Sequence, residues 1–367
     1  MKRSAIFNTV AALVFVSLGV LFISCDQEPL FWDVAHAYSP ISPRINGAPS
    51  KIVEITSGTL YVSNGRVWEY SGTPPVWHVL NTAPPDIRDL AAVGSTLYAL
   101  SGSGILSKTT NGVDWDTVDL TGVNGKIESI FGAGSDLFAG SLTGKPGASE
   151  SNTVYSIYRY TGSWVTPAIA SNTGKLTGAA VVSGVTYLGT LGTGMLASDS
   201  SYQKVSFLND DFIMGLTFDS SNLYIITSTR VCHISGGSLA SSISGTFTEA
   251  IAVWSHGTDK LLLIGVRSGS GSNGWGYREI NITTGAFSSG IKVPGANPAP
   301  FSVRPDNQYT SGIGKHVVNY LWVLDITKND SEDDETNPRP IVFASTVKNG
   351  LWSYKKRGDD PQWNGER

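Results

Sequence analysis

The stretch "STLYALSGSGILSKTTNGVDWDTV", Ser95–Val118, decides the fold. It reads as a strand, a Gly-rich turn, a second strand, a tight turn and a Trp. Leu97 to Leu100 are apolar at every position rather than at alternate ones, which is typical of a strand that is buried on both faces. One such unit says little about a fold, so the first question is whether the unit recurs.

The Leu-Tyr strand does recur along the chain. Clear copies are "SGTLYVS", "GSDLFAGS", "SGVTYLGT" and "SSNLYIIT", and degenerate copies are "GTDKLLLIG" and "PIVFAST". The aligned rings are Tyr61, Tyr98, Phe138, Tyr187 and Tyr224, at spacings of 37, 40, 49 and 37 residues, and the last two copies centre near Leu262 and Ala344. This spacing predicts seven copies of one structural unit.

Each copy lies between other short predicted strands. A strand such as "IRDLAAV" precedes it, and a turn with a strand such as "GSGILSK" follows it. Several units close with a fourth segment that holds an aromatic residue: Trp77, Trp115, Trp164, Phe287 and Trp363. Four strands per unit of about 40 residues is the layout of a β-propeller blade. We predict an all-β chain, a β-propeller of seven four-stranded blades closed by N- and C-terminal strands, with six or eight blades as alternatives.

The N-terminus reads as a targeting segment. A basic start at Lys2–Arg3 precedes the apolar run Val10–Ile23, which is short for a membrane span and fits the core of a signal peptide. Cys25 follows at the expected cleavage point. The pattern resembles the lipobox of bacterial lipoproteins in a relaxed form, with Phe22 and Ile23 before the Cys, as in spirochaete lipoproteins. The resemblance implies lipidation at Cys25; the alternative is an ordinary secretory signal with a coincidental Cys.

These features divide the chain into three parts. Residues 1–24 are the predicted signal peptide, 25–45 a lipidated N-terminus and tether, and 46–367 the propeller. Within the tether, Leu30–Tyr38 is a candidate for the outer strand that closes the last blade. The lipid would attach the protein to a membrane of the cell envelope, on the periplasmic or outer-membrane face.

Charge and cysteine content exclude some classes of function. Without the signal peptide the chain has 24 basic and 30 acidic residues, a charge of −6, which argues against a nucleic-acid partner.

The cysteine and histidine residues do not form a reactive or metal-binding pattern. With Cys25 lipidated, Cys232 has no partner for an intrachain disulfide. Cys232 and His233 are neighbours in a predicted strand and point to opposite faces, so they do not form a nucleophile–base pair. The five His residues lack metal-ligand spacing, and we expect no metal, no cofactor and a monomer.

Two motifs resemble those of known propellers. "TTNGVDW", Thr109–Trp115, resembles the Asp-box of sialidase-like and photosynthesis-assembly propellers, in which the box shapes a turn between the two outer strands. Gly112 and Trp115 match that pattern. "EINITTGAF", Glu279–Phe287, resembles the end of a quinoprotein-type repeat, a family that includes a lipid-anchored propeller assisting outer-membrane assembly. Both resemblances imply the fold, and neither implies a catalytic residue.

Two segments depart from the repeat. Residues 290–314 are rich in Pro and Gly and carry Phe301, Arg304 and Tyr309, an aromatic and Arg set that suits partner binding. The alternative is a spacer between the sixth and seventh blades. Residues 329–337 are acidic, which is typical of a solvated hairpin tip.

The sequence therefore favours a non-enzymatic, lipid-anchored propeller that binds an envelope protein or a glycan as a scaffold module. The alternative is an enzyme, a hydrolase or lyase, with a site at the mouth of the channel built from several blades. Converging acids, Arg and His would favour the enzyme, and exposed Trp or Tyr platforms would favour a glycan partner.

Overall fold

The structure is a computed structural model. It describes residues 43–72, 75–144, 154–165, 174–208, 212–266, 276–284, 287, 313, 316–324, 340–357 and 360–366, with only the backbone described at 200, 256, 355–357 and 360–365. These residues belong to one compact unit, Ser42–Arg367. Among them, no helix has the length and apolar character needed to cross a membrane.

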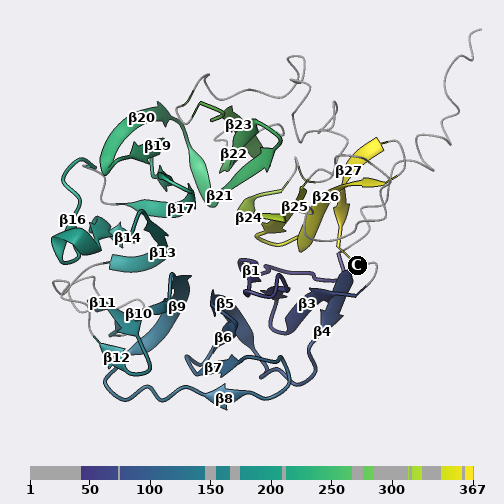
Figure 1. The fold of residues 1–367 in the computed structure, drawn as a ribbon. Coiled ribbons are helices and arrows are strands. Elements are labelled where there is room, and N and C mark those ends of the chain that lie inside the picture. Colours follow the sequence, from purple (N-terminus) through teal and green to yellow (C-terminus); the bar gives the residue numbers. More distant parts are fainter. Residues whose placement is uncertain are drawn as a thin grey trace, which may run out of the picture. The chain divides into compact units, whose positions relative to one another are not determined.

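The described residues form seven antiparallel sheets in a ring, with one strand of each sheet toward the centre (Figure 1). The innermost strands are β1 (Val53–Glu54), β5 (Ile87–Val93), β9 (Lys126–Ala133), β13 (Gly174–Val182), β17 (Ile213–Asp219), β21 (Phe247–His256) and β24 (Val318–Leu324). The second strands are β2 (Leu60–Ser63), β6 (Thr96–Ser101), β10 (Asp136–Thr143), β14 (Val185–Gly192), β18 (Asn222–Thr227), β22 (Asp259–Val266) and β25 (Ile341–Thr346). The third strands are β3 (Val67–Ser71), β7 (Leu106–Thr109), β11 (Val154–Tyr160), β15 (Gly194–Ala197), β19 (Arg230–Ser235), β23 (Tyr277–Asn281) and β26 (Leu351–Arg357).

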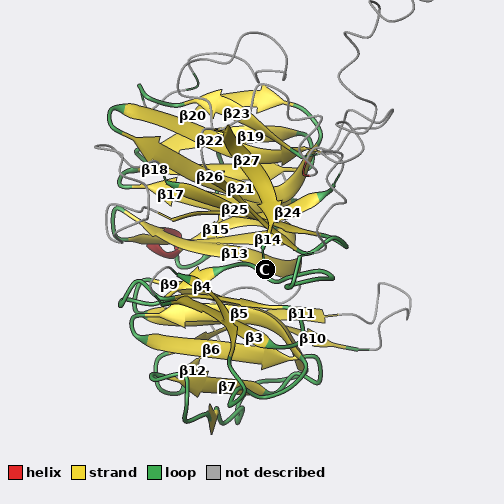
Figure 2. Cartoon of the chain, turned by 90° about the vertical axis from the view of Figure 1, so that its right-hand side faces the viewer, coloured by secondary structure: helices red, strands yellow, loops and turns green. Residues whose placement is uncertain are grey.

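Six of the sheets have a fourth, outer strand among the described residues. These are β4 (Val76–Val79), β8 (Asp116–Thr117), β12 (Trp164–Val165), β16 (Gln203–Lys204), β20 (Ser238–Ser244) and β27 (Asp360–Gly365). The sixth sheet has three described strands, β21 to β23. Strands make up nearly all of the regular structure, and helix is represented by the short 3-10 turn η2 (Ser198–Ser200) (Figure 2). The prediction of an all-β propeller with seven blades is confirmed.

The second strand of each blade is the most deeply buried. All four residues of β2 are buried, as are all six of β25 and five of the six in β6. The repeated rings lie here, and Phe138 and Tyr224 are completely enclosed. Because each blade packs between two neighbours, its middle strands have no solvent-facing side, which explains the continuous apolar runs in the sequence.

The hydrophobic core consists of seven clusters, each shared by two adjacent blades. The cluster between the first and second blades, for example, joins Tyr61 and Val67 to Leu90 and Leu97. Stability therefore depends on every neighbour being present, because each blade buries apolar area against both sides.

The ring closes between the first and last blades. Tyr70 and Trp77 of the first blade pack against Phe343 of the seventh, with ring centroids 5.4 and 5.7 Å from that of Phe343. The first described residues also pair with the C-terminal blade: the Leu351 N–H donates to the Ile45 carbonyl at 2.9 Å.

The outer strand of the last blade is β27, from the C-terminal end of the chain. The suggestion that Leu30–Tyr38 fills this position is therefore not confirmed. Residues 30–38 themselves lie outside the described part of the chain.

The Asp-box-like segment forms the turn between β7 and β8, as the resemblance implied. The Thr109 hydroxyl accepts hydrogen bonds from the N–H groups of Asn111 and Gly112, and Gly112 has a φ of 72°. The Asn111 side chain in turn accepts from the N–H groups of Val113 and Asp114. These polar side chains satisfy the turn backbone, so the motif here has a structural role.

Tyr61 gives a test of this core at alkaline pH. Burial, and then the Glu69 carboxylate, raises the pKa of Tyr61 to about 12. Its hydroxyl makes no hydrogen bond within the described residues. An unfolded Tyr titrates near 10, so the stability that Tyr61 contributes is complete below that pH and is lost as the pH rises toward 12.

We predict that Tyr61→Phe leaves stability nearly unchanged at neutral pH. Above pH 10 the variant should become more stable than the parent protein, by about 1–2 kcal/mol near pH 12, because Phe cannot ionise. Urea unfolding across the pH range measures this difference. Parallel pH profiles for the two proteins would contradict the proposed burial of Tyr61.

Candidate functional site in the central channel

A cavity of about 660 Å³ lies at the centre of the ring and is lined by all seven innermost strands or the residues that lead into them. This volume is within the range of small-molecule and peptide sites, roughly 300–1,000 Å³. Its lining includes one or more residues from each blade, for example Lys51, Arg88, Ser129, Lys175, Met214, Glu249 and Tyr320. The sequence positions of these residues are far apart, and only closure of the ring brings them together.

A β-bulge near the start of the innermost strand shapes this lining. The pairing with the second strand shifts there in six blades, for example between Ile87 and Asp89 and between Val318 and Tyr320. The extra residue breaks the strict alternation of side chains. As a result, consecutive residues such as Arg88 and Asp89 both line the cavity.

Polar side chains link each blade to the next at this level. At six of the seven junctions in the described structure, a side chain of one blade donates to a backbone carbonyl near the start of the next innermost strand. The pairs are Ser63 to Ile87 (2.9 Å), Arg88 to Ile127 (2.5 Å), Ser129 to Leu176 (2.9 Å), Thr177 to Ile213 (2.6 Å), Thr248 to Val318 (2.5 Å) and Ser345 to Ser50 (3.0 Å). These contacts show that the strand starts lie side by side around the axis.

The remaining junction, between β17 and β21, relies on a glycine. A Cβ at Gly215 would lie 2.2 Å from the carbonyl oxygen of Glu249. The two backbones can therefore approach this closely only because position 215 has no side chain.

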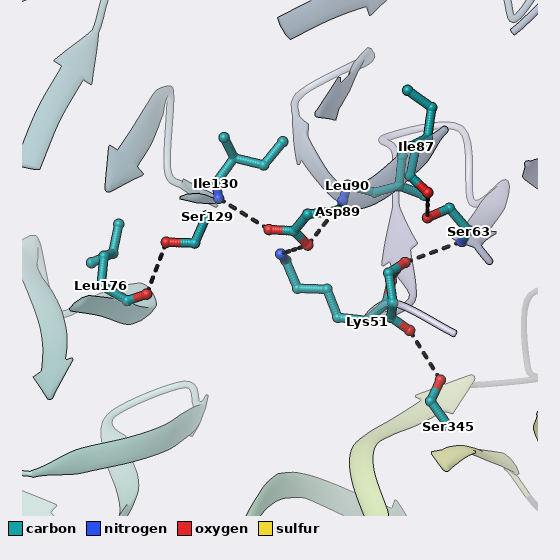
Figure 3. Close-up of polar contacts among 10 residues, drawn as sticks. Lys51, Ser63, Ile87, Asp89, Leu90, Ser129, Ile130, Leu176 and Ser345 are labelled. Atoms are coloured by element: carbon teal, nitrogen blue, oxygen red, sulfur yellow. Dashed lines mark hydrogen bonds and ion pairs between the residues drawn. The ribbon is translucent and has the colours of Figure 1, made fainter. Parts of the chain in front are cut away.

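Asp89 connects three blades at the channel wall (Figure 3). One carboxylate oxygen accepts from Lys51 Nζ of the first blade and from the Leu90 N–H, and the other accepts from the Ile130 N–H of the third blade at 3.0 Å. The Lys51 ammonium also lies 4.2 Å from the centroid of the Phe131 ring. Burial lowers the pKa of Lys51, and the Asp89 carboxylate opposes this effect. Lys51 and Asp89 are therefore committed to structure.

Other polar atoms in the lining have no hydrogen-bond partner in the described structure. Arg88 Nη2 bonds the Ile127 carbonyl and lies 3.6 Å from Glu128, but Arg88 Nε is buried without a partner. Asn319 Oδ1 and Trp322 Nε1 are likewise buried and unsatisfied. Such atoms are costly to leave unpaired, and all three belong to residues that line the cavity.

Lys175 and Glu249 are exposed at the cavity and form no ion pair within the described residues. The surrounding protein desolvates the Glu249 carboxylate and raises its pKa, an effect that Lys175 partly offsets. Lys175 also contributes to the lowered pKa of Lys51. Burial, followed by Asp89 and Glu249, raises the pKa of Tyr320. These mutual effects show that the groups share one electrostatic environment although they come from five blades.

We call this region, where the innermost strands begin, the polar end of the channel. It comprises Lys51, Arg88, Asp89, Glu128, Lys175, Glu249, Asn319 and Tyr320. Farther along the same strands the lining becomes mostly apolar, with Ala91, Phe131, Phe218, Val253 and Val323, and Glu54 as a charged residue. The channel is therefore polar at one end and mostly apolar at the other.

The structure does not describe the site residues proposed from the sequence. Cys25, Phe301, Arg304 and Tyr309 all lie outside the described residues, as does the acidic segment 329–337. Cys232 is buried in the core between the fourth and fifth blades, and His233 is buried with its Nε2 2.9 Å from Asn222 Oδ1. Within the part of the chain that is described, no three His, Cys, Asp or Glu side chains gather as metal ligands.

The residues of the polar end do not form a motif in the sequence, because they are scattered along the chain. A signal is nevertheless present once the repeats are aligned: charged residues interrupt otherwise apolar strands in "SKIVEI", "IRDLAAV", "KIESIF" and "FTEAIA". Charges at corresponding places in several buried strands indicate a shared polar channel.

Neither a family model nor a curated protein matches the chain. Solved structures do match in fold. The structure described as "YCF48 bound to D1 peptide" is 11% identical, covers 86% of this chain and 94% of its own, and has a TM-score of 0.52. The WD40 propeller domain of Doa1 is 10% identical, with 85% and 93% covered and a TM-score of 0.53. An ancestral GH74 enzyme is 13% identical, with 89% of this chain but 47% of that one covered, at a TM-score of 0.57. At these identities the likeness shows the fold alone.

The contacts of Asp89 predict unequal costs for its two simplest variants. Asp89→Asn leaves Lys51 without its counterion and puts an amide where the carboxylate accepts from backbone N–H groups. Lys51→Met leaves Asp89 with both backbone donors. Asp89→Asn should therefore lower the free energy of unfolding more than Lys51→Met does. The loss should stay below the roughly 3–5 kcal/mol that breaking a fully buried pair costs, because the Asp89 and Lys51 side chains are 14 and 15% exposed.

The difference in free energy of unfolding between Asp89→Asn and Lys51→Met should narrow as the pH rises. A buried Lys with a lowered pKa carries a cost while it is charged, and this cost disappears as it deprotonates in the folded state. Urea unfolding at neutral and alkaline pH measures both effects. Equal destabilisation by the two variants would contradict the role assigned to Asp89.

Proposed function

We propose that the chain is a lipid-anchored binding module that receives part of a partner protein at the polar end of its channel. The observation that carries this proposal is the set of unsatisfied groups there, with Lys175 and Glu249 unpaired in the described structure and Asn319 Oδ1 buried without a partner. A closed ring fixes the backbone that carries these groups before binding, so little backbone entropy is lost when a ligand docks.

The mixture of charges favours a protein partner over a glycan. An ammonium and a carboxylate in one cavity complement a ligand that carries both signs. A partner that places like charges against them is disfavoured. YCF48, which shares the fold, has been solved with a peptide. A glycan would instead use the aromatic faces of Tyr320 and Trp322, which also line the cavity.

Two observations favour an enzymatic function: acids and Arg88 converge at the polar end, and the pKa of Glu249 is raised. Glycoside hydrolysis, however, generally uses a pair of carboxylates. At the polar end Asp89 is held by Lys51 and two backbone N–H groups, and Glu128 lies beside Arg88. Glu249 therefore has no second uncommitted carboxylate there, and binding is the function that the arrangement supports best.

We further propose that residues 290–314 contribute to the partner surface through Phe301, Arg304 and Tyr309. This segment precedes β24 in the chain, and the channel residues Asn319 and Tyr320 lie near the start of β24. The segment is thus connected in sequence to the polar end.

An affinity pull-down from the native envelope tests the proposed function. We predict that the double variant Lys175→Ala, Glu249→Ala loses the partner, because both unpaired charges are removed, while a Lys108→Ala, Asp116→Ala control on the outer strands retains it. A third protein, with 290–314 replaced by a Gly-Ser turn, tests the segment separately. Full recovery of the partner by the channel variant would place binding elsewhere on the propeller.

The lipid anchor has its own test. We predict that Cys25→Ala abolishes incorporation of radiolabelled palmitate and releases the protein from the membrane fraction or leaves it uncleaved, because the thiol that carries the lipid is absent. Ser24→Ala, next to the acylation site, is the control and should remain labelled. Palmitate incorporation into the Cys25 variant would contradict the proposed anchor.

A further inference from the structure

We propose that the polar end of the channel binds a short peptide segment that carries one carboxylate and one ammonium group, with Lys175 and Glu249 as their respective partners. This inference rests on the proposed function and specifies its ligand. The ligand charges come either from the two ends of a free peptide or from acidic and basic side chains within a longer chain.

The charge balance of the site leads to this ligand. Three cations and three anions line the polar end, and four of them are already paired: Lys51 with Asp89, and Arg88 with Glu128. One cation and one anion remain. Both Lys175 and Glu249 are exposed to the cavity. Their side chains do not form an ion pair with each other in the described structure. A ligand with a single charge would leave one of them uncompensated.

The hydrogen-bonding atoms without partners favour a peptide over other molecules with two charges. Asn319 Oδ1 is an acceptor without a donor, and Arg88 Nε and Trp322 Nε1 are donors without an acceptor. A peptide unit supplies one N–H and one C=O, the two complements that these atoms lack. A sugar hydroxyl would satisfy the same atoms and hydrogen-bond Lys175 or Glu249, but it carries no charge to neutralise either of them.

The size and the rest of the lining agree with this choice. A cavity of about 660 Å³ has room for a few residues rather than for a folded domain. Met214, Leu216 and Ile251 lie beside the polar groups and offer contacts for an apolar side chain. We therefore expect an apolar residue between the two charges.

The test is calorimetric titration of the full-length protein with defined peptides. The probes are Ala-Leu-Ala with free ends, its N-acetyl form, its C-terminal amide, and the end-blocked pentapeptide acetyl-Ala-Lys-Leu-Glu-Ala-amide. Chitotriose serves as an uncharged glycan. If free ends are recognised, acetylation and amidation should each weaken binding by about tenfold, the value of one charge-assisted hydrogen bond. If internal side chains are recognised, the blocked pentapeptide should bind instead.

Variants assign each end of the ligand to its partner. Lys175→Met should remove the preference for a free carboxylate and leave the preference for a free amine, and Glu249→Gln should do the opposite. Lys175→Arg keeps the charge and should retain binding, and the outer-strand variant Lys108→Met should bind as the parent does. Added salt should weaken binding of the charged probes.

Three results would each overturn the inference. In the first, chitotriose binds and no peptide does. In the second, free and blocked Ala-Leu-Ala bind equally and the pentapeptide does not bind, and in the third no probe binds. Such results leave the proposed function intact if the channel variants still lose the partner in the envelope pull-down. If those variants retain the partner, the proposed function fails with the inference.

Discussion

Closing seven sheets around one axis brings the starts of seven strands together in a small space, and the rest of the structure depends on how their backbone groups are satisfied there. The side-chain bonds between blades, from Ser63 to Ile87 around to Ser345 and Ser50, meet this requirement at six junctions of the described ring. At the seventh, Gly215 permits a backbone approach that a Cβ would block. Polar residues are thus required at the innermost position of an otherwise apolar fold.

This requirement also produces the candidate site. The bulges that place these residues allow neighbouring side chains to line the same cavity, so structural and uncommitted polar groups occur together. Asp89 has three partners and holds three blades, whereas Lys175 and Glu249 have none in the described structure. The distinction between the two kinds of residue rests on contacts, and it separates groups that maintain the ring from groups that are available to a ligand.

The sequence was sufficient to predict the propeller and its blade number because burial between sheets leaves a local pattern. Tyr98 in "TLYALS" and Tyr224 in "NLYIIT" lie in strands with no solvent-facing side, and such runs repeat visibly. A site at the mouth of the channel was offered as an alternative, but the residues of the polar end were not predicted. A blade contributes at most two of them and their types differ: Lys51, Asp89 and Tyr320 occupy corresponding levels. Their convergence follows from closure of the ring, which no single repeat encodes. The residues selected instead, among them Cys25 and Arg304, lie outside the described structure and remain predictions.

Site-specific photo-crosslinking tests most directly whether the channel is where this protein meets its partner. A benzophenone amino acid at Tyr320 would occupy the polar end, and the same group at Val113, which is 60% exposed in the turn between the outer strands β7 and β8, would report on the rim. In the native envelope, our account predicts a partner crosslink from position 320 and none from position 113. A crosslink from position 113 alone would contradict it and would move the binding surface to the outside of the ring.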